Sequence, residues 1–521
     1  GAATMGPRKA DRRGFSKLAV VSVLSALFGA GLQSLVRTKE AAPRPPQWGA
    51  LVRRQNETIA SLRSSLQSAL KLQTTAAREP FAAPTHQQDH QEERKESECE
   101  SKFGAGLVES YRSSKRTWCD GESKVECYQH AYHHDGRVGL FCVGTDLVID
   151  FAKVRTKGKY LAFDEDGATT GNCRKTADWS PELFMPHMAP QLRAFRSQAL
   201  EKRDDAMVVE ETAYLLARDE DCENMFHSTA DHLNAFLVGK VLDLDWRQTR
   251  VVLWDGHGDG PFIELIRRSF SPNFDVRRPS DYGRRVARFR RVVFHLESPA
   301  GIVFPKVADG PKGIMRCRGS SLWLGFKDHV LDAFDLLHRP PPSDPHLILS
   351  VRRRTKAKNV GRVFADEAGL VSVLKKGTPP FSFEVVDLAT LSFADQLRKM
   401  RSANVLVGAH GAGLMHVLFL AEEAVLVEIH PSYRLDRHFR LAARMVNKIY
   451  LPLRSTQPVS CTGSSDSIPV DLNQFHTVVD AAVRLARAFD DGVAECGLQC
   501  DPKLLALDPG AAKALPPGTT P

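Results

Sequence analysis

Long hydrophobic runs are scarce in this sequence, which limits how the chain can be attached to a membrane. One uncharged stretch of 19 residues, from Leu18 to Val36, is about as long as a helix that crosses a bilayer. No second stretch of this kind follows, and this excludes a protein built from several membrane-spanning helices.

A strong excess of one charge sign, gathered in one region, is also missing. The chain has 71 Lys and Arg residues against 62 Asp and Glu residues, and its net charge of +9 is spread along the sequence. This balance argues against a nucleic-acid-binding protein, which would concentrate its basic residues in one region. It fits a mildly basic enzyme that handles a negatively charged small molecule.

The charges around Leu18–Val36 predict the orientation of this stretch. Basic residues dominate the segment before it: Arg8, Lys9, Arg12, Arg13 and Lys17. The positive-inside rule then places residues 1–17 in the cytoplasm and the rest of the chain across the membrane. We expect a signal anchor at 18–36 and a single-pass type II protein with a lumenal body, in the Golgi or the ER. A cleaved signal peptide is the alternative, because the stretch is short and contains Gly and Ser.

Cysteine is absent before residue 99, and all ten cysteines lie from there onward. An even number of cysteines in an oxidising compartment predicts disulfides, although the spacing does not fix their pairing. Cys496 and Cys500 have a spacing that would suit a metal, but no matching second pair accompanies them, which argues against zinc. Asn56 begins an Asn-Glu-Thr triplet and is a candidate N-glycosylation site.

Composition divides the remaining chain into a folded body and two polar segments. Residues 37–98 are rich in Gln, Ala, Ser, Pro and charge, which predicts a flexible stem. Residues 503–521 are rich in Pro and Gly, which predicts a disordered tail. Between them we expect an N-terminal lobe at 99–340, with a cysteine-rich front, and a C-terminal lobe at 341–502.

Short apolar runs alternate with amphipathic segments in the C-terminal lobe. The pattern predicts strands at 346–353, 381–388, 404–410, 424–430 and 448–453, and helices at 366–376, 393–403 and 436–446, with another helix starting at 411. Such alternation is typical of a parallel sheet covered on both faces. The N-terminal lobe is also mixed, with strands predicted at 250–256 and 291–298. We therefore predict an α/β fold with two Rossmann-like lobes and a cleft at the carboxyl ends of their strands.

A glycine-dense loop follows the predicted strand at 404–410. It has neither the spacing of a Walker loop nor the full dinucleotide fingerprint, which argues against a nucleotidase and a dehydrogenase. His410 stands at the carboxyl end of the strand, and Gly411 and Gly413 would let backbone N–H groups approach an anion at a helix start. The alternative is a tight strand-to-helix turn with a packed histidine.

Four blocks in one order resemble glycosyltransferase family 61. They are ENMFHSTADHLNAFLV (223–238), VVLWDGHGDGPFIELIRRSFS (251–271), ILSVRRRTKAKNVGRVFADE (348–367) and VGAHGAGLMHVLFL (407–420). Within the family, CESKFGAGL, FCVGTDLVI, SPAGIVFPK and CRGSSLW are similar to plant-type N-glycan β-1,2-xylosyltransferases. GNCR and the segment around the glycine loop are similar to relatives that add N-acetylglucosamine to EGF-like domains. The predicted anchor favours a Golgi xylosyltransferase, and the second activity is the alternative.

The resemblance implies a GT-B type fold and an inverting transfer from a UDP-sugar to a glycoprotein, without an essential metal. It places the following residues around the departing diphosphate: Arg352, Arg354, Arg362, His410, Gly411 and Gly413. Guanidinium groups and loop amides can neutralise such a group. Glu428 resembles a position that accepts hydrogen bonds from the nucleoside ribose. The alternatives are a solvated basic face for the arginines and a surface-edge carboxylate for Glu428.

His227 and Asp231 are the candidate catalytic pair. They are four residues apart, so a helix would place both on one face. A carboxylate beside an imidazole fixes its tautomer and raises its basicity, so this pair could deprotonate an acceptor hydroxyl, with Asn224 nearby. The alternative is a capping network at a helix start. Asp255 and His257 end another predicted strand and are candidate donor or acceptor contacts. No second aspartate follows Asp255 two residues later, which weakens a manganese requirement.

Two binding hypotheses compete with the enzyme. A catalytically silent family member would use the same cleft to bind glycans. A membrane-tethered adhesion protein would use the cysteine-rich front between Cys99 and Cys173. Turnover of a UDP-sugar by a soluble form would identify the enzyme, whereas glycan binding without turnover would identify a binder.

Overall fold

The structure, a computed structural model, describes residues 99–131, 138–164, 167–199, 206–219, 221–298, 301–303, 317, 319–340, 344–353, 361–377, 381–422, 424–431, 438–456 and 467–490. The chain divides into two compact units, Gly1–Pro84 and Thr85–Pro521, and all described residues belong to the second. The predicted anchor, stem and tail, together with Asn56, Cys496 and Cys500, lie outside the described residues. Within the described ranges, no helix is both long and apolar enough to cross a membrane.

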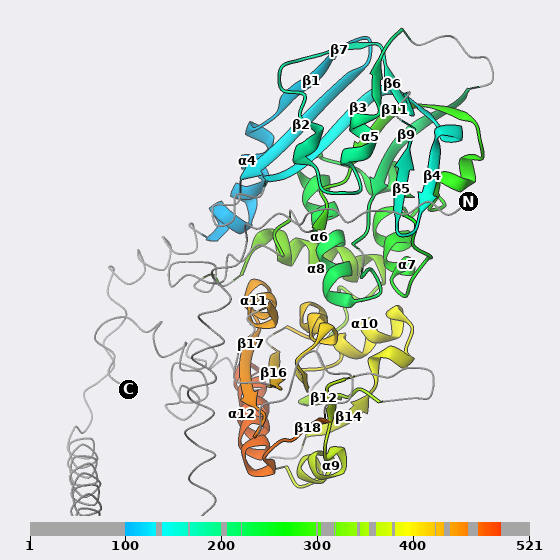
Figure 1. The fold of residues 1–521 in the computed structure, drawn as a ribbon. Helices are drawn as coiled ribbons and strands as arrows, with labels where there is room; N and C mark the ends of the chain where they lie inside the picture. Colours follow the sequence, from blue (N-terminus) through cyan, green and yellow to red (C-terminus); the bar gives the residue numbers. More distant parts are fainter. Residues whose placement is uncertain are drawn as a thin grey trace, which may run out of the picture. The chain divides into compact units, whose positions relative to one another are not determined.

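The first half of the described chain forms a nine-stranded mixed sheet (Figure 1). Three of its strands are parallel: β10 (Thr249–Leu253), β9 (Met207–Leu216) and β11 (Val286–Phe294). Antiparallel strands continue it beyond β11: β3 (Val138–Asp150), β2 (Lys124–Ala131), β1 (Arg116–Gly121) and β7 (Cys173–Lys175). The prediction of a Rossmann-like lobe is therefore wrong for most of this sheet. The two residues between β1 and β2 allow an antiparallel pair, whereas a parallel pair needs a long crossover.

Smaller elements complete this half. Strands β6 (Thr169–Gly171) and β8 (Phe195–Ser197) join the sheet beside β3, while β4 (Val154–Lys157) and β5 (Tyr160–Phe163) form a separate hairpin. The helices are α4 (Ala105–Ser113), α5 (Ala189–Arg193) and α7 (Ile263–Leu265), which continues as a π-helical turn at Ile266–Phe270.

Helices α6 (Met225–Leu242) and α8 (Ser321–Ala333) lie between the mixed sheet and a second sheet (Figure 1). Almost every residue of α6 is buried, polar residues included, so this helix is enclosed on all sides rather than amphipathic. One continuous hydrophobic cluster contains residues of α6, of α8 and of the near face of the second sheet. The helices thus form a shared core between the two sheets.

The second sheet has five strands, all parallel, which confirms the prediction for this half. Their order is β14 (Ser382–Val386), β12 (His346–Ser350), β15 (Val405–Ala409), β16 (Val425–His430) and β17 (Ile449–Arg454). Alternate residues face opposite sides: Leu347 and Leu349 belong to one hydrophobic cluster and Ile348 to another.

Helices cover both faces of this parallel sheet (Figure 1). One face packs on α9 (Glu367–Lys375) and α12 (Leu472–Asp490). The other packs on α10 (Phe393–Arg401), α11 (His438–Met445) and the 3-10 helix η10 (Ala412–Phe419), where the sequence had predicted an α-helix start. A short pair, β13 (Val363–Phe364) with β18 (Ser467–Ile468), lies outside the main sheets.

The strand order of the parallel sheet contains a topological switch point. From β12 the chain crosses to β14 on one side and then to β15 on the other. Crossover helices therefore leave in opposite directions at the carboxyl ends of β12 and β15, and open α/β sheets bind ligands at such a point. Residues after Ser350 and after Ala409 flank it, so the fold brings the arginine block beside the glycine loop.

Three disulfides connect described cysteines: Cys99–Cys317, Cys119–Cys173 and Cys127–Cys142. The prediction of disulfides is confirmed. Cys222 is buried and unpaired among the described cysteines, and Cys461 lies outside the described residues.

Candidate active site

Two arginines meet the glycine loop at the switch point. Arg352 follows β12, and Arg362 donates a hydrogen bond from Nη1 to the carbonyl oxygen of His410 at 2.8 Å. Arg352 packs against Gly411 so closely that a Cβ on Gly411 would lie 2.5 Å from its Nη2. Burial lowers the pKa of Arg352, and the charge of Arg362 lowers it further. Like charges held together at a half-buried sheet edge favour an anionic ligand.

Arg362 has an unusual backbone conformation for its residue type. Its φ of 62° lies in the left-handed region, which costs a non-glycine residue on the order of 1 kcal/mol. Strained residues persist where the surrounding structure holds them, often at ligand sites. The conformation directs its side chain to the carbonyl of His410.

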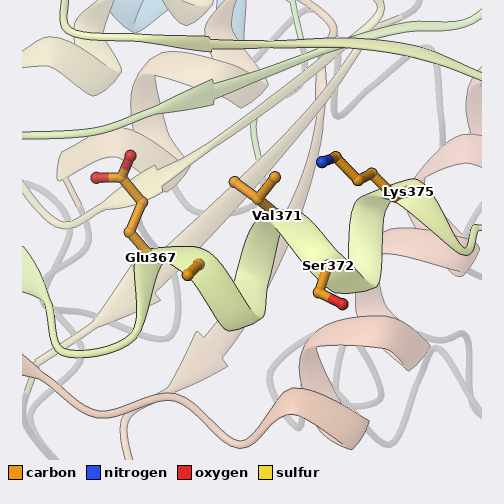
Figure 2. Close-up of a pocket in the computed structure, with 5 residues that line it drawn as sticks. Glu367, Val371, Ser372 and Lys375 are labelled. Carbon is orange, nitrogen blue, oxygen red and sulfur yellow. The ribbon is translucent and has the colours of Figure 1, made fainter.

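The other arginines of the block do not extend this group. Arg353 is exposed and donates to Glu367 Oε1 at 2.7 Å on α9. Arg354 lies outside the described residues. Glu367 also borders a shallow hollow of about 480 Å³, where Glu367, Val371 and Lys375 project from one side of α9 (Figure 2). Because a single helix lines it and Arg352 and His410 do not, this hollow is separate from the candidate site.

His410 lies between the loop and a buried carboxylate. Its Nδ1 donates to Glu428 Oε1 at 2.5 Å, and Glu428 is fully buried. Burial would raise the pKa of Glu428, but hydrogen bonds with His410 and His430 lower it, so the carboxylate stays ionised. Glu428 Oε2 accepts from the Tyr450 hydroxyl at 2.8 Å. Glu428 therefore fixes the His410 ring by a hydrogen bond from the interior of the sheet. Its predicted contact with a ribose stays a prediction.

The two glycines of the loop have different surroundings. Gly411 precedes η10, and its carbonyl accepts from the N–H of Leu414 at 2.9 Å. The carbonyl of Gly413 accepts from His416 Nδ1 at 2.8 Å, and a Cβ on Gly413 would meet Leu388 at an ordinary 3.6 Å. Close packing at the arginine thus depends on Gly411 rather than Gly413.

On the mixed-sheet side, the carboxylate beside His227 is Asp219 and not the predicted Asp231. His227 Nδ1 donates to Asp219 Oδ1 at 2.8 Å, and the side chain of His227 is 27% exposed. Burial would lower the pKa of His227, but the hydrogen bond and charge of Asp219 raise it. Burial also opposes the charge on Asp219, yet its hydrogen bond with His227 lowers the pKa of Asp219 to about 2. The pair has the form of a general base with an orienting carboxylate.

Asp231 lies deeper, behind this pair. It is 1% exposed, and its Oδ2 accepts from the backbone N–H of Asp219 at 2.9 Å. Burial raises the pKa of Asp231 well above its ordinary value. His227 lies near the start of α6 and is partly exposed, whereas Asp231, one turn further along the helix, is inside the core. Asp231 therefore positions the Asp219 loop and does not contact the imidazole.

The other predicted site residues, Asn224, Asp255 and His257, lie near the His227–Asp219 pair. Asn224 caps α6, since its Oδ1 accepts from Phe226 N–H at 3.0 Å. Asp255 is buried and binds Arg218 through both oxygens, at 2.9 Å to Nε and 2.7 Å to Nη2. A pocket of about 200 Å³ lies here, and its lining includes Lys159, Asp221, Cys222, Glu223 and His257. Asp221 Oδ2 is 4.0 Å from His227 Nε2, so the pocket adjoins the candidate base.

Aromatic contacts connect the two halves of the site. Phe226, next to His227, lies 6.2 Å from Phe439 between ring centroids, and Phe439 lies 5.2 Å from the His410 ring. Phe226 also contacts His438 at 4.9 Å. The imidazole on the mixed-sheet side and the arginine group on the parallel-sheet side therefore border one region, with α11 between them.

Comparison with known proteins agrees with this geometry. The family model described as Glycosyltransferase 61 matches residues 176–427. The chain carries a glycosyltransferase 61 domain. Similar proteins include the EGF domain-specific O-linked N-acetylglucosamine transferases of Gallus gallus, 24% identical over 62% of this chain and 61% of the relative, and of Drosophila melanogaster, 25% identical over 60% and 59%. The corresponding protein of Mus musculus is 25% identical over 56% of each chain. The chain thus spans about three-fifths of the length of these relatives.

The glycosyltransferase 61 domain contains most of the candidate site. Asp219, His227, Arg352, Arg362 and His410 all lie between residues 176 and 427. The match crosses from the mixed sheet into the parallel sheet, so the site depends on both. The supporting Glu428 follows the last matched residue directly.

Several residues of the candidate site, inside this domain and just after it, had no prediction from sequence. Asp219 follows β9, and the long β-rich run at 207–216 followed by acidic residues could have placed it at a strand's carboxyl end. Arg218, His430 and Tyr450 act through buried partners, which spacing in the sequence does not reveal.

A metal remains to be considered. His410, Glu428 and His430 offer ligand atoms that all lie within 4.8 Å of one another, a nitrogen and carboxylate set that suits Zn²⁺. Each of the three also takes part in hydrogen bonds with the others or with Tyr450. The expectation that no metal is essential stays a prediction.

Proposed function

We propose that this chain is an inverting glycosyltransferase that uses a UDP-sugar, with two facing lobes of the GT-B type. The observation that carries the proposal is the convergence of Arg352 and Arg362 on the His410–Gly411 turn at the switch point. A diphosphate needs charge compensation as it departs, and this turn brings two half-buried guanidinium groups together at the ligand edge of the sheet.

On the donor side, the two guanidinium groups stabilise the departing diphosphate. The bond from the anomeric carbon to the diphosphate oxygen breaks, and its electron pair leaves with UDP. Arg352 and Arg362 can each present paired N–H donors to those oxygens. His410 lies beside them and holds Arg362 through its carbonyl oxygen. No metal is assigned a role in the reaction.

On the acceptor side, His227 takes the proton of the attacking hydroxyl. Asp219 holds the ring through Nδ1 at 2.8 Å and favours the imidazolium that forms. The hydroxyl oxygen then bonds to the anomeric carbon from the face opposite UDP, which inverts its configuration. The pocket that adjoins His227 at Asp221 is the proposed binding site for the acceptor.

For the substrates, N-acetylglucosamine and an EGF-like domain are the best-supported pair. The support is the activity named for the relatives from Gallus gallus, Mus musculus and Drosophila melanogaster. The xylose preference expected from short blocks has no counterpart among these relatives, and a sugar pocket can change with few side chains. Xylose on an N-glycan therefore becomes the comparison arm of the test.

We also propose that the body works in the lumen of the secretory pathway, carried there by the segment at 18–36. Three disulfides among the described cysteines support an oxidising compartment. The uncharged length of the segment at 18–36 and the basic residues before it also support this proposal.

The test is a donor and acceptor panel with the purified full chain. UDP-N-acetylglucosamine and UDP-xylose are each offered with a folded EGF-like domain and with an N-glycan, and products are read by mass spectrometry. We expect an N-acetylhexosamine added to the EGF-like domain, with release of UDP, and no loss of rate in a chelator.

Each other outcome changes the proposal in a defined way. A pentose on the N-glycan would restore the xylosyltransferase hypothesis. Binding of glycan without turnover of either donor would support the non-catalytic family member. Failure to bind UDP at all would remove the diphosphate site and the enzyme with it.

A further inference from the structure

Three buried side chains stand behind His410 in the parallel sheet. Glu428 and His430 come from β16 and Tyr450 comes from β17, and they are 0%, 1% and 6% exposed. Alternation along β16 places Glu428 and His430 on the same face as Leu426, whose partner across the strands is Tyr450. Toward the amino ends of the strands this face of the sheet carries aliphatic residues, including Leu406 and Leu426. The three polar side chains therefore interrupt an apolar face.

These side chains form a hydrogen-bond chain that ends at one carboxylate. His410 Nδ1–H donates to Glu428 Oε1 at 2.5 Å, and the Tyr450 hydroxyl donates to Oε2 at 2.8 Å. Since the Tyr450 hydroxyl is the donor to Glu428, its oxygen accepts from His430 Nε2–H, also at 2.8 Å. Every donor in the chain points toward Glu428, and aligned bonds of this kind strengthen one another.

Filling a core with such a hydrogen-bond network costs desolvation free energy. A buried carboxylate costs several kcal/mol in desolvation, roughly offset by its partners, and apolar residues of similar volume are often as stabilising. Its retention at the carboxyl end of β16, next to the glycine loop, points to the site rather than to the fold.

The His410 ring is also fixed on its other sides. It stacks on His430 with ring centroids 5.6 Å apart, and Phe439 meets it edge-on at 5.2 Å. Its backbone N–H donates to Ile429 and its carbonyl accepts from Arg362. Any rotation of the ring would therefore disturb the turn that Arg352 and Arg362 contact.

We infer that Tyr450 and His430 are positioning residues: through Glu428 they hold His410 in one tautomer and one orientation beside the donor diphosphate. The inference rests on the proposed function. It assigns Tyr450 and His430 no contact with substrate. Their effect passes through the two carboxylate oxygens, each of which has its own donor.

The same donor atoms could hold a metal, and the two roles make different demands. A metal bound by His410, Glu428 and His430 would need lone pairs that Nδ1 of His410 and Nε2 of His430 lose when those atoms carry protons. The hydrogen-bond chain uses these nitrogens as donors. Metal content therefore distinguishes the two.

Tyr450→Phe tests the inference, because it removes one hydroxyl and keeps the ring. We expect UDP affinity, measured by calorimetry, to fall about three- to ten-fold, less than the roughly ten-fold or larger effect of a lost hydrogen bond to a charged group, because the loss reaches UDP only through His410. Losing a donor also makes Glu428 easier to protonate, so affinity should begin to fall at a higher pH on the acid side. The groups that face Glu428 here are His410, His430 and Tyr450.

Tyr214→Phe is the matched control. Tyr214 is fully buried in β9, and its hydroxyl contacts His295 Nδ1 at 2.8 Å as the Tyr450 hydroxyl contacts His430, but it contacts no carboxylate in the described structure. Both variants should lose thermal stability, but Tyr214→Phe should keep the affinity and pH profile of the natural chain. An unchanged affinity and profile in Tyr450→Phe would overturn the inference.

Two further outcomes separate this inference from the proposed function. If the natural chain binds no UDP, the proposed function fails and the inference fails with it. If the natural chain binds UDP, but only while it retains one equivalent of Zn²⁺ that a chelator removes, the cluster is a metal site and the positioning role is overturned. UDP binding by metal-free natural chain, together with the Tyr450→Phe shift, supports both.

Discussion

At the scale of single residues, Gly411 is where one methyl group should have a specific effect. A Cβ there would lie 2.5 Å from Arg352 Nη2, so Gly411→Ala must displace the guanidinium group. Loss of a charge-assisted contact to phosphate costs about 1.5 kcal/mol or more, which is roughly ten-fold in affinity. We expect UDP binding to weaken by about this factor in a calorimetric titration.

Gly413→Ala is the control for that substitution. It adds the same methyl group two residues away, where the nearest atom is Leu388 Cδ1 at 3.6 Å. Neither glycine has a left-handed backbone, so alanine introduces no strain of that kind at either position. Equal losses of affinity in the two variants would contradict the assignment of Arg352 to the diphosphate.

Asp219 should control the pH dependence of the reaction. His227 must be neutral to accept a proton, and Asp219 raises the pKa of His227, so activity should fall on the acid side. In Asp219→Asn this acid limb of kcat/KM should move to lower pH, because the raising charge is gone. The rate itself should drop by about a hundred-fold, since the ring loses its orienting partner. An acid limb that stays in place would exclude His227 as the base.

The residues of the site differed in how far the sequence could predict them. Arg352 and His410 were predicted because each follows a strand at the ligand edge, a position that chain order determines, whereas Arg362 was predicted from the family resemblance. The partner of His227 was not, since spacing on a helix selects Asp231 whereas the loop after β9 supplies Asp219. For Glu428 the alternative to a ribose contact was a surface-edge carboxylate, and the burial of β16 along its whole length contradicts that alternative. The sequence pattern did not reveal how deeply each residue is buried.

At the scale of elements, the start of α6 links stability to activity. Asn224→Ala removes the cap on Phe226 N–H and should cost about 1 kcal/mol of stability. It should also lower activity, because His227 sits in the first turn and depends on the same loop. Asp366→Ala is the comparison: Asp366 caps α9 through Gly369 N–H at 2.7 Å, away from the site. Its loss should lower the melting temperature alone, and an equal activity loss in both variants would contradict the link.

The elements themselves were predictable where hydrophobic period and chain order agree. Alternating runs gave the parallel strands and α9, α10 and α11 to within a few residues, because strands buried on both faces are continuously apolar. Helix α12 had no prediction, although Phe475, Val478, Val479 and Ala482 repeat with helical period and are buried. The antiparallel strands of the mixed sheet could not be assigned an order, since hairpin partners depend on long-range pairing rather than on local pattern.

At the scale of the whole described body, a buried charge cluster joins α8 to the parallel sheet. Three cations surround Glu422: Lys327 of α8 at 2.9 Å, Lys448 before β17 at 3.3 Å and Arg401 of α10 at 3.6 Å. The cation side chains are 1–6% exposed, whereas Glu422 is 53% exposed. Burial outweighs the attraction and lowers the pKa of Lys448 to about 8, so it is still protonated at neutral pH. Glu422 therefore connects α8 to α10 and to the start of β17.

Glu422→Gln should loosen this junction and reveal its pH dependence. Burial opposes the charge of Glu422, but Lys448 and Lys327 lower the pKa of Glu422 to about 2. A carboxylate with a lowered pKa stabilises the fold above its ordinary pKa of about 4.5 and loses that effect as pH falls toward 2. With half of the side chain exposed, we expect a loss of about 1–2 kcal/mol in unfolding free energy at pH 7. The difference should shrink progressively below pH 4.5 in denaturant titrations. Glu109→Gln, which removes an exposed partner of Arg112, should change stability by less than about 0.5 kcal/mol. A Glu422→Gln difference that persists unchanged to pH 3 would show that packing, rather than charge, joins α8 to the sheet.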